Sequence, residues 1–127
     1  MASLPPAIQE LTGIKGDEPE IAAEVVAVLI KLYEGGVPSA EEEQILVNPV
    51  ESGAILSILS RRPISHRYVK ERSRPHIRDH RSVRHRGLVP AKRAGKTNLY
   101  RLGDVYRLGP IRQRQNPKKK STAANIP

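Results

Sequence analysis

Hydrophobic residues in the first quarter of the chain recur three and four positions apart. The set comprises Ile21, Val25, Val28, Leu29 and Leu32. This spacing gives an α-helix one apolar face. Pro19 near the start and two glycines after Glu34 are the residue types that commonly flank a helix. The pattern predicts a helix over residues 18–34.

Two shorter helices are predicted next. Ser39 with Glu42 three positions later matches a capping box, which opens a helix through about Leu46 that Asn48 and the following proline close. The apolar cluster within residues 51–60 predicts a third helix, which an Arg-Arg-Pro sequence ends.

The apolar faces of these three helices exceed what the helices can hide from each other. Residues 18–60 are therefore expected to form a small bundle or a homodimerisation surface. Packing of the same faces onto the C-terminal half of the chain is an equally weighted alternative.

The C-terminal half predicts two further helices, a β-hairpin and a last helical turn. These elements cover residues 65–72 and 76–86, the strands 88–93 and 98–102 around a glycine-containing turn, and residues 105–108. From residue 109 onward the sequence is polar, lysine-rich and without periodicity, which predicts disorder. The expected fold is mainly α with a small β-hairpin.

Charge divides the chain into two halves. Residues 1–60 hold ten acidic and two basic residues, a net charge of −8, whereas residues 61–127 hold twenty basic and three acidic residues, a net charge of +17. The switch coincides with a helix-breaking Pro63. We therefore expect an acidic helical module over residues 1–62, a nucleic-acid-binding domain over 63–109 and a basic tail over 110–127.

So many positive charges repel each other unless they meet a polyanion, and phosphate backbones are the commonest such partner. The alternative is a basic segment that is solvated or rests on the acidic half of a neighbouring copy.

Composition excludes several classes of protein. The chain has no cysteine, so neither disulfides nor thiolate metal sites are possible. The longest apolar run is too short to span a bilayer, and the start lacks a secretory signal, so a cytoplasmic protein is expected, nucleoid-associated if bacterial. His76 and His80 are spaced to share a helix face, but two ligands do not complete a zinc site. No catalytic constellation or phosphate-binding glycine loop is present, so neither an enzyme nor a cofactor is expected.

A resemblance to a known family rests on residues 87–108. The motifs are Gly87-Leu88-Val89-Pro90, Lys92-Arg93, Gly95-Lys96, Tyr100-Arg101 and Asp104-Val105, in that order. This stretch resembles the wing of the MerR family and of the related phage excisionases. The resemblance implies a winged helix-turn-helix in which residues 64–86 supply the two helices before the wing. The N-terminal 60 residues have no place in the usual MerR order.

Candidate DNA contacts follow from the basic residues of the predicted helix 76–86 and of the hairpin. They are Arg78, Arg81, Arg84, His85 and Arg86 on the helix, and Lys92, Arg93, Lys96 and Arg101 on the hairpin. A basic helix fits the major groove of duplex DNA, where arginine can contact guanine edges and phosphates. The expected function is sequence-specific DNA binding, as a small transcriptional regulator or an excisionase-like architectural factor.

Two alternatives remain open at this point. One is a structural RNA-binding protein, such as a ribosome-associated component. The other is an adaptor whose N-terminal helices bind a protein while the basic half anchors it to nucleic acid. An RNA-bound structural protein needs no ordered wing, so the predicted hairpin favours DNA.

Overall fold

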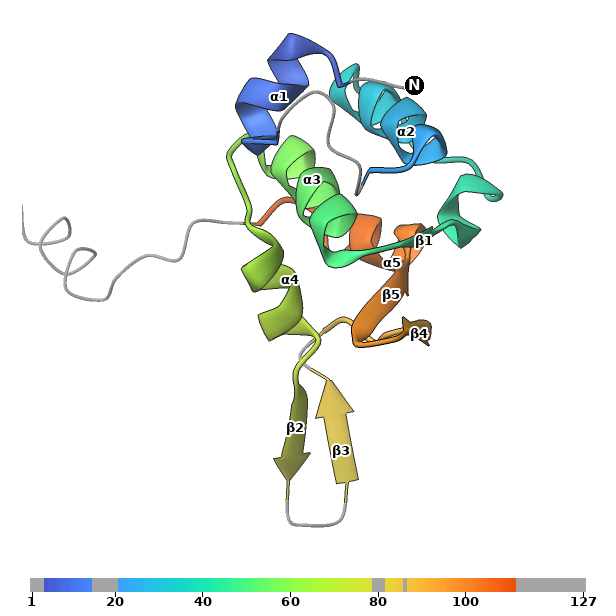
Figure 1. Cartoon of the computed structure of the whole chain (residues 1–127), viewed down its shortest axis with the longest axis vertical. Coiled ribbons are helices and arrows are strands. Elements are labelled where there is room, and N and C mark those ends of the chain that lie inside the picture. Colours follow the sequence, from blue (N-terminus) through green and yellow to red (C-terminus); the bar gives the residue numbers. More distant parts are fainter. Residues whose placement is uncertain (1–3, 15–20, 79–81, 86, 112–127) are drawn as a thin grey trace, which may run out of the picture.

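The computed structural model describes residues 4–14, 21–78, 82–85 and 87–111. The helices are α1 (Pro6–Thr12), α2 (Ala23–Tyr33), a 3-10 helix η1 (Glu42–Gln44), α3 (Pro49–Ser60), α4 (His66–Arg72) and α5 (Leu102–Arg107). The strands are β1 (Leu46–Val47), β2 (Pro75–Arg78), β3 (Ser82–His85), β4 (Lys92–Ala94) and β5 (Thr97–Arg101). A mainly helical fold with a small β component is thereby confirmed (Figure 1). The start of the helix predicted over residues 18–34 and the predicted tail beyond residue 111 lie outside the described residues.

The strands form two separate antiparallel units. Strands β1, β5 and β4 make a sheet in that spatial order, so a short strand from the acidic half pairs with the C-terminal hairpin. In its register Val47 lies opposite Tyr100, and Lys92 lies opposite Leu99. The hairpin predicted over residues 88–102 is confirmed, with shorter strands than expected. Strands β2 and β3 pair only with each other as a ribbon.

Helix α3 begins where the sequence analysis placed the end of a different helix. The Asn48 side chain accepts a hydrogen bond from the Glu51 backbone N–H at 2.8 Å, and the Glu51 carboxylate accepts one from the Asn48 N–H at 2.8 Å. This reciprocal capping box, with Pro49 in the first turn, starts the helix. The interpretation of Asn48 as a helix end was therefore wrong.

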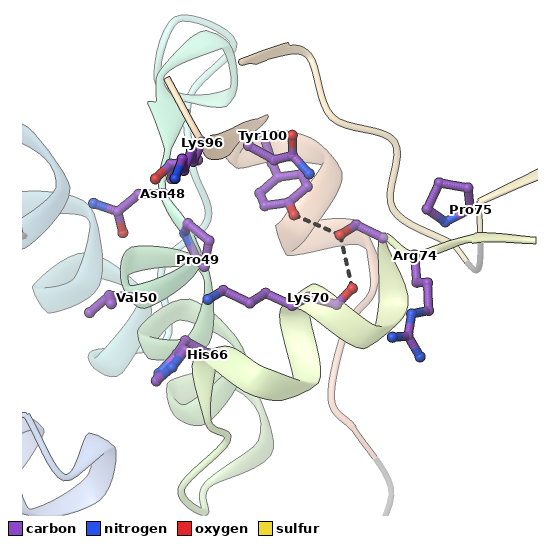
Figure 2. A pocket seen from close by; sticks show the side chains of 12 residues that line it. Asn48, Pro49, Val50, His66, Lys70, Arg74, Pro75, Lys96 and Tyr100 are labelled. Carbon is purple, nitrogen blue, oxygen red and sulfur yellow. Dashed lines mark hydrogen bonds between the residues drawn. The ribbon is translucent and has the colours of Figure 1, made fainter. Parts of the chain in front are cut away.

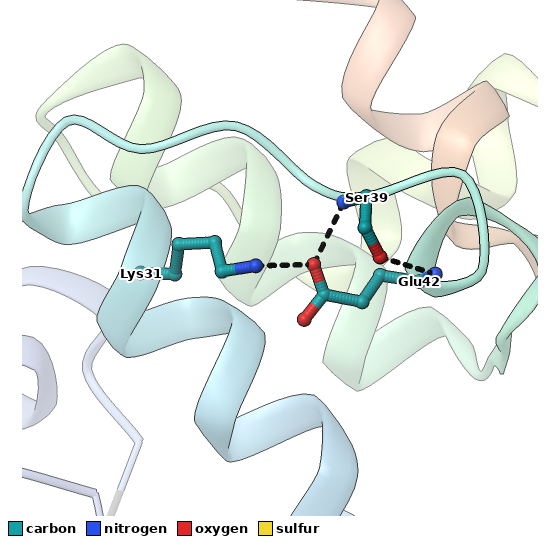
Figure 3. A network of polar contacts seen from close by, with 3 residues as sticks. All are labelled: Lys31, Ser39 and Glu42. Atoms are coloured by element: carbon teal, nitrogen blue, oxygen red, sulfur yellow. Dashed lines mark hydrogen bonds and ion pairs between the residues drawn. The ribbon is translucent and has the colours of Figure 1, made fainter.

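The segment before α3 is less helical than predicted. Ser39 and Glu42 form both capping-box hydrogen bonds, at 3.1 Å and 2.8 Å, but the turn that they open is the three-residue η1 (Figure 3). Leu46 belongs to β1 and not to a helix. Lys31 Nζ donates to Glu42 Oε1 at 2.6 Å, which ties the end of α2 to this turn and lowers the pKa of the Glu42 carboxyl.

One hydrophobic core joins the two halves of the chain. Helix α3 lies at its centre and contacts α1, α2, α4 and α5. The core includes Val25 and Ile55 from the acidic half and Val69 and Leu102 from the basic half. The predicted boundary at residues 62 and 63 therefore runs through a shared core. The apolar faces of α2 and α3 are covered by other parts of the same chain, as expected if these faces pack onto the C-terminal half. Homodimerisation through residues 18–60 stays a prediction.

The helix predicted over residues 76–86 is not formed, and this prediction was wrong. Strands β2 and β3 occupy the described part of this segment, and Ile77 lies opposite Val83 in their register. Residues six positions apart fall on well-separated faces of an α-helix, so one helix face cannot hold both apolar residues. Cross-strand pairing brings them together and uses the preference of β-branched residues for strands.

Candidate nucleic-acid interface

A groove lies between the exposed face of α4 and the turn that joins β4 to β5. Its volume is about 620 Å³, and its lining includes Asn48, His66, Lys70, Arg74, Lys96 and Tyr100 (Figure 2). His66 and Lys70 are four residues apart in α4, a spacing that keeps side chains on one helix face, and Arg74 lies just beyond the end of that helix. The groove therefore joins residues from the start of α3, from α4 and from the hairpin.

The close approach of α3 and α4 sets the position of the helical wall of the groove. A Cβ atom at Gly53 would lie 3.1 Å from the carbonyl oxygen of Ile64 and 3.3 Å from the backbone nitrogen of His66. Ser57 Oγ accepts a hydrogen bond from the Ile64 N–H at 2.8 Å and donates to the Gly53 carbonyl at 2.7 Å. The buried serine and the missing side chain at residue 53 thus hold a tight turn between the two helices.

A buried polar contact fixes the other wall relative to α4. The hydroxyl groups of Ser73 and Tyr100 lie 2.7 Å apart, and Ser73 Oγ also bonds the Lys70 carbonyl oxygen at 3.1 Å (Figure 2). Tyr100 is fully buried in β5, and Val69 of α4 is likewise buried in the core. Since the Ser73–Tyr100 contact is buried, the end of α4 and the second strand of the hairpin are held in one geometry.

The charged side chains that line the groove are lysines and an arginine. Lys70, Arg74 and Lys96 are exposed, and none of the described residues that line the groove is acidic. Within the described part of the chain, the ion pairs engage Lys31 and Arg107, and none reaches the three groove cations. These cations are therefore available to an anionic ligand.

The hairpin adds further cations beside the groove. Lys92 and Arg93 are exposed on β4. Arg93 Nε donates to the Gly95 carbonyl oxygen at 3.0 Å, which holds its side chain over the turn. Gly95 has a φ of 62°, a conformation that favours glycine, so this residue allows the tight turn that presents Lys96.

The predicted contact residues separate into two groups. Lys92, Arg93, Lys96 and Arg101 lie on the β4–β5 hairpin, as predicted, and Lys96 lines the groove. The group predicted on a helix is not on one. Arg78 lies in β2, Arg84 and His85 lie in β3, and Arg81 and Arg86 lie outside the described residues.

Sequence reasoning missed the wall of the groove that α4 and the residues after it supply, namely His66, Lys70 and Arg74. Their four-residue spacing was visible in the sequence. It was overlooked because the denser arginine run after Pro75 suggested the recognition helix.

No protein-family model, curated protein or solved structure matches this chain. Among the residues that the structure describes, no helix combines the length and apolar character needed to cross a membrane. In the same residues no three His, Asp or Glu side chains gather where they could hold a metal ion.

Proposed function

We propose that this protein binds duplex DNA in a sequence-specific way through a winged helix-turn-helix. In this proposal α3 and α4 are the helix-turn-helix, α4 is the recognition helix, and the β4–β5 hairpin is the wing. The observation that carries the proposal is the groove between α4 and the hairpin. Lys70, Arg74 and Lys96 line it, and none of the described residues in its lining is acidic.

The order of elements supports the assignment. Strand β1, helices α3 and α4 and the β4–β5 hairpin occur in this order along the chain, with the β2–β3 ribbon between α4 and the hairpin, and β1 pairs with β5. This arrangement moves the two helices upstream of the position that the family resemblance implied, from residues 64–86 to residues 49–72. The wing motifs keep their predicted place.

The dimensions of α4 suit the major groove. An α-helix with its side chains is about 10–12 Å in diameter, and the major groove of B-DNA, at about 12 Å wide, admits one; α4 supplies seven residues of such a helix. His66, Arg67 and Lys70 are exposed along it, while Val69 is buried against the core. One face can thus meet base edges or phosphates while the opposite face holds the helix in place.

The wing supplies backbone contacts in this proposal. Lys92, Arg93 and Lys96 extend the positive surface beyond α4, where they can contact phosphates on either side of the major groove. A small transcriptional regulator or an excisionase-like architectural factor would use such a module.

The test is a salt titration of binding to mixed-sequence duplex DNA and to structured RNA of equal length. The groove variant carries Lys70→Gln and Lys96→Gln. The control variant carries Arg61→Gln and Arg107→Gln, which removes the same charge from exposed positions outside the groove lining.

Loss of two phosphate contacts should lower the slope of log K against log salt by about 1.8 and weaken duplex binding about 10-fold or more. The control should change affinity about twofold at most. Selection from a random duplex library should return one motif for the intact chain. Equal or stronger binding to RNA, or equal effects of both variants, would overturn the proposal.

A further inference from the structure

The β2–β3 ribbon follows α4, and its first residue, Pro75, lines the groove. It projects from the end of α4, away from the helices (Figure 1). Its four-residue strands pair with each other from Pro75 opposite His85 to Arg78 opposite Ser82. The Leu88 N–H donates to the Arg72 carbonyl oxygen at 3.3 Å, so the chain leaves the core and returns to it at one point.

The composition of this ribbon is strongly basic. From Arg74 to Gly87, inclusive, the sequence contains five arginines, three histidines and one aspartate. Opposed residues of an antiparallel ladder share a face, and successive pairs alternate between faces. In the register His76 is paired with Arg84, and Ile77 is paired with Val83.

The ribbon is continuous with the candidate interface. Arg74 and Pro75 line the groove, and Pro75 is also the first residue of β2. The basic ribbon therefore begins at the edge of the groove.

We propose that the β2–β3 ribbon is a second DNA-contacting arm, which lies along the phosphate backbone next to the site occupied by α4. This inference rests on the proposed function. A strand of four residues spans about 13 Å. At about 3.4 Å per base pair, the ribbon lengthens the contacted duplex by about four base pairs. Because it meets phosphates, it adds affinity and salt dependence and does not change the sequence that is selected.

Two variants test the arm. The first carries Arg78→Gln and Arg84→Gln and keeps the ribbon. The second replaces residues 75–85 with a three-residue Gly-Ser-Gly linker, which the single Arg72–Leu88 closure permits. The Arg61→Gln, Arg107→Gln variant is the matched control for lost charge. Thermal unfolding of each variant verifies that the core is intact.

The double variant should lower the slope of log K against log salt by about 1.8 and weaken binding to all duplex sequences alike, by about 10-fold. The linker variant should shorten the hydroxyl-radical footprint by about four base pairs and retain the selected motif.

An unchanged salt slope in the double variant together with an unchanged footprint in the linker variant would overturn the arm. If the Lys70→Gln, Lys96→Gln variant still loses duplex binding in that case, the proposed function stands without the arm. A changed motif would also overturn the arm, since it would make the ribbon a reader of bases. Failure of the intact chain to bind duplex DNA would overturn both proposals. Loss of RNA binding alone in the double variant would assign the ribbon to RNA.

Discussion

The two β-hairpins of this protein are held in place by different forces. In the β4–β5 hairpin, Tyr100 is fully buried, and β5 also pairs with β1. In the β2–β3 ribbon, each strand pairs only with the other. The first hairpin is therefore part of the core, whereas the ladder of the second joins only its own two strands. Since an isolated two-stranded ribbon is marginally stable at best, the β2–β3 ribbon is expected to add little to the free energy of unfolding.

The sharpest way to break this comparison is to remove the anchor of the first hairpin. Tyr100→Ala deletes a fully buried aromatic ring and should lower the free energy of unfolding by about 3–5 kcal/mol. Urea denaturation followed by circular dichroism measures the loss. A loss below about 1 kcal/mol would mean that the β4–β5 hairpin is not anchored as described.

A smaller change isolates the polar contact of the same anchor. Tyr100→Phe keeps the ring but removes the hydroxyl that lies 2.7 Å from Ser73 Oγ. The expected loss is about 1 kcal/mol, since Ser73 retains its bond to the Lys70 carbonyl oxygen. DNA affinity should fall together with stability if this contact aligns α4 with the wing. Affinity equal to that of the unaltered chain would show that the alignment does not need it.

A still smaller effect is expected from pH. Glu51 is a buried charged residue, and its desolvation raises the pKa of its carboxyl. A carboxyl that binds its proton more tightly when folded contributes stability below its ordinary pKa of 4.5, and this stability is lost as the pH rises to the raised value.

Glu42, whose pKa is lowered by the bond to Lys31, acts in the opposite sense and below pH 4.5. The free energy of unfolding, measured with urea between pH 4 and pH 7, should therefore decline above pH 4.5. Glu51→Gln should remove that decline. The same decline in both proteins would assign it to other groups.

The smallest effect on stability should come from the apolar pair of the second ribbon. Ile77→Thr with Val83→Thr weakens one cross-strand pair, which contributes less than about 1 kcal/mol. The midpoint of global urea unfolding should hardly move. A loss comparable to that of Tyr100→Ala would show that the ribbon is part of the cooperative core, and the contrast between the two hairpins would collapse.

Periodicity identified the elements whose apolar residues enter the core. It predicted α2 from the spacing of Val25 and Leu29 and predicted the β4–β5 hairpin from its glycine turn and flanking strands. These elements satisfy their local preferences and their tertiary contacts at once, so a local pattern is sufficient to find them.

The ribbon and the start of α3 were predicted incorrectly for different reasons. Asn48-Pro49 carries signals for both a helix end and a helix start, and only the reciprocal bonds with Glu51 distinguish the two. In residues 75–85 the arginine run suggested a recognition helix, although Ile77 and Val83 are spaced for a cross-strand pair. The cations of the β4–β5 hairpin at the candidate site were predicted, but Lys70 and Arg74 were not, because an error in one element moved the expected helix along the chain.

The burial of α3 on all sides carries a consequence for how the molecule can be divided. Every described residue from Glu51 to Ile58 is shielded from solvent, with the acidic helices on one side and the basic elements on the other. Removing either half would expose core residues of the other half to water. The helices of the acidic half are thus the scaffold on which the cationic surface is built, and the two oppositely charged halves form a single thermodynamic unit.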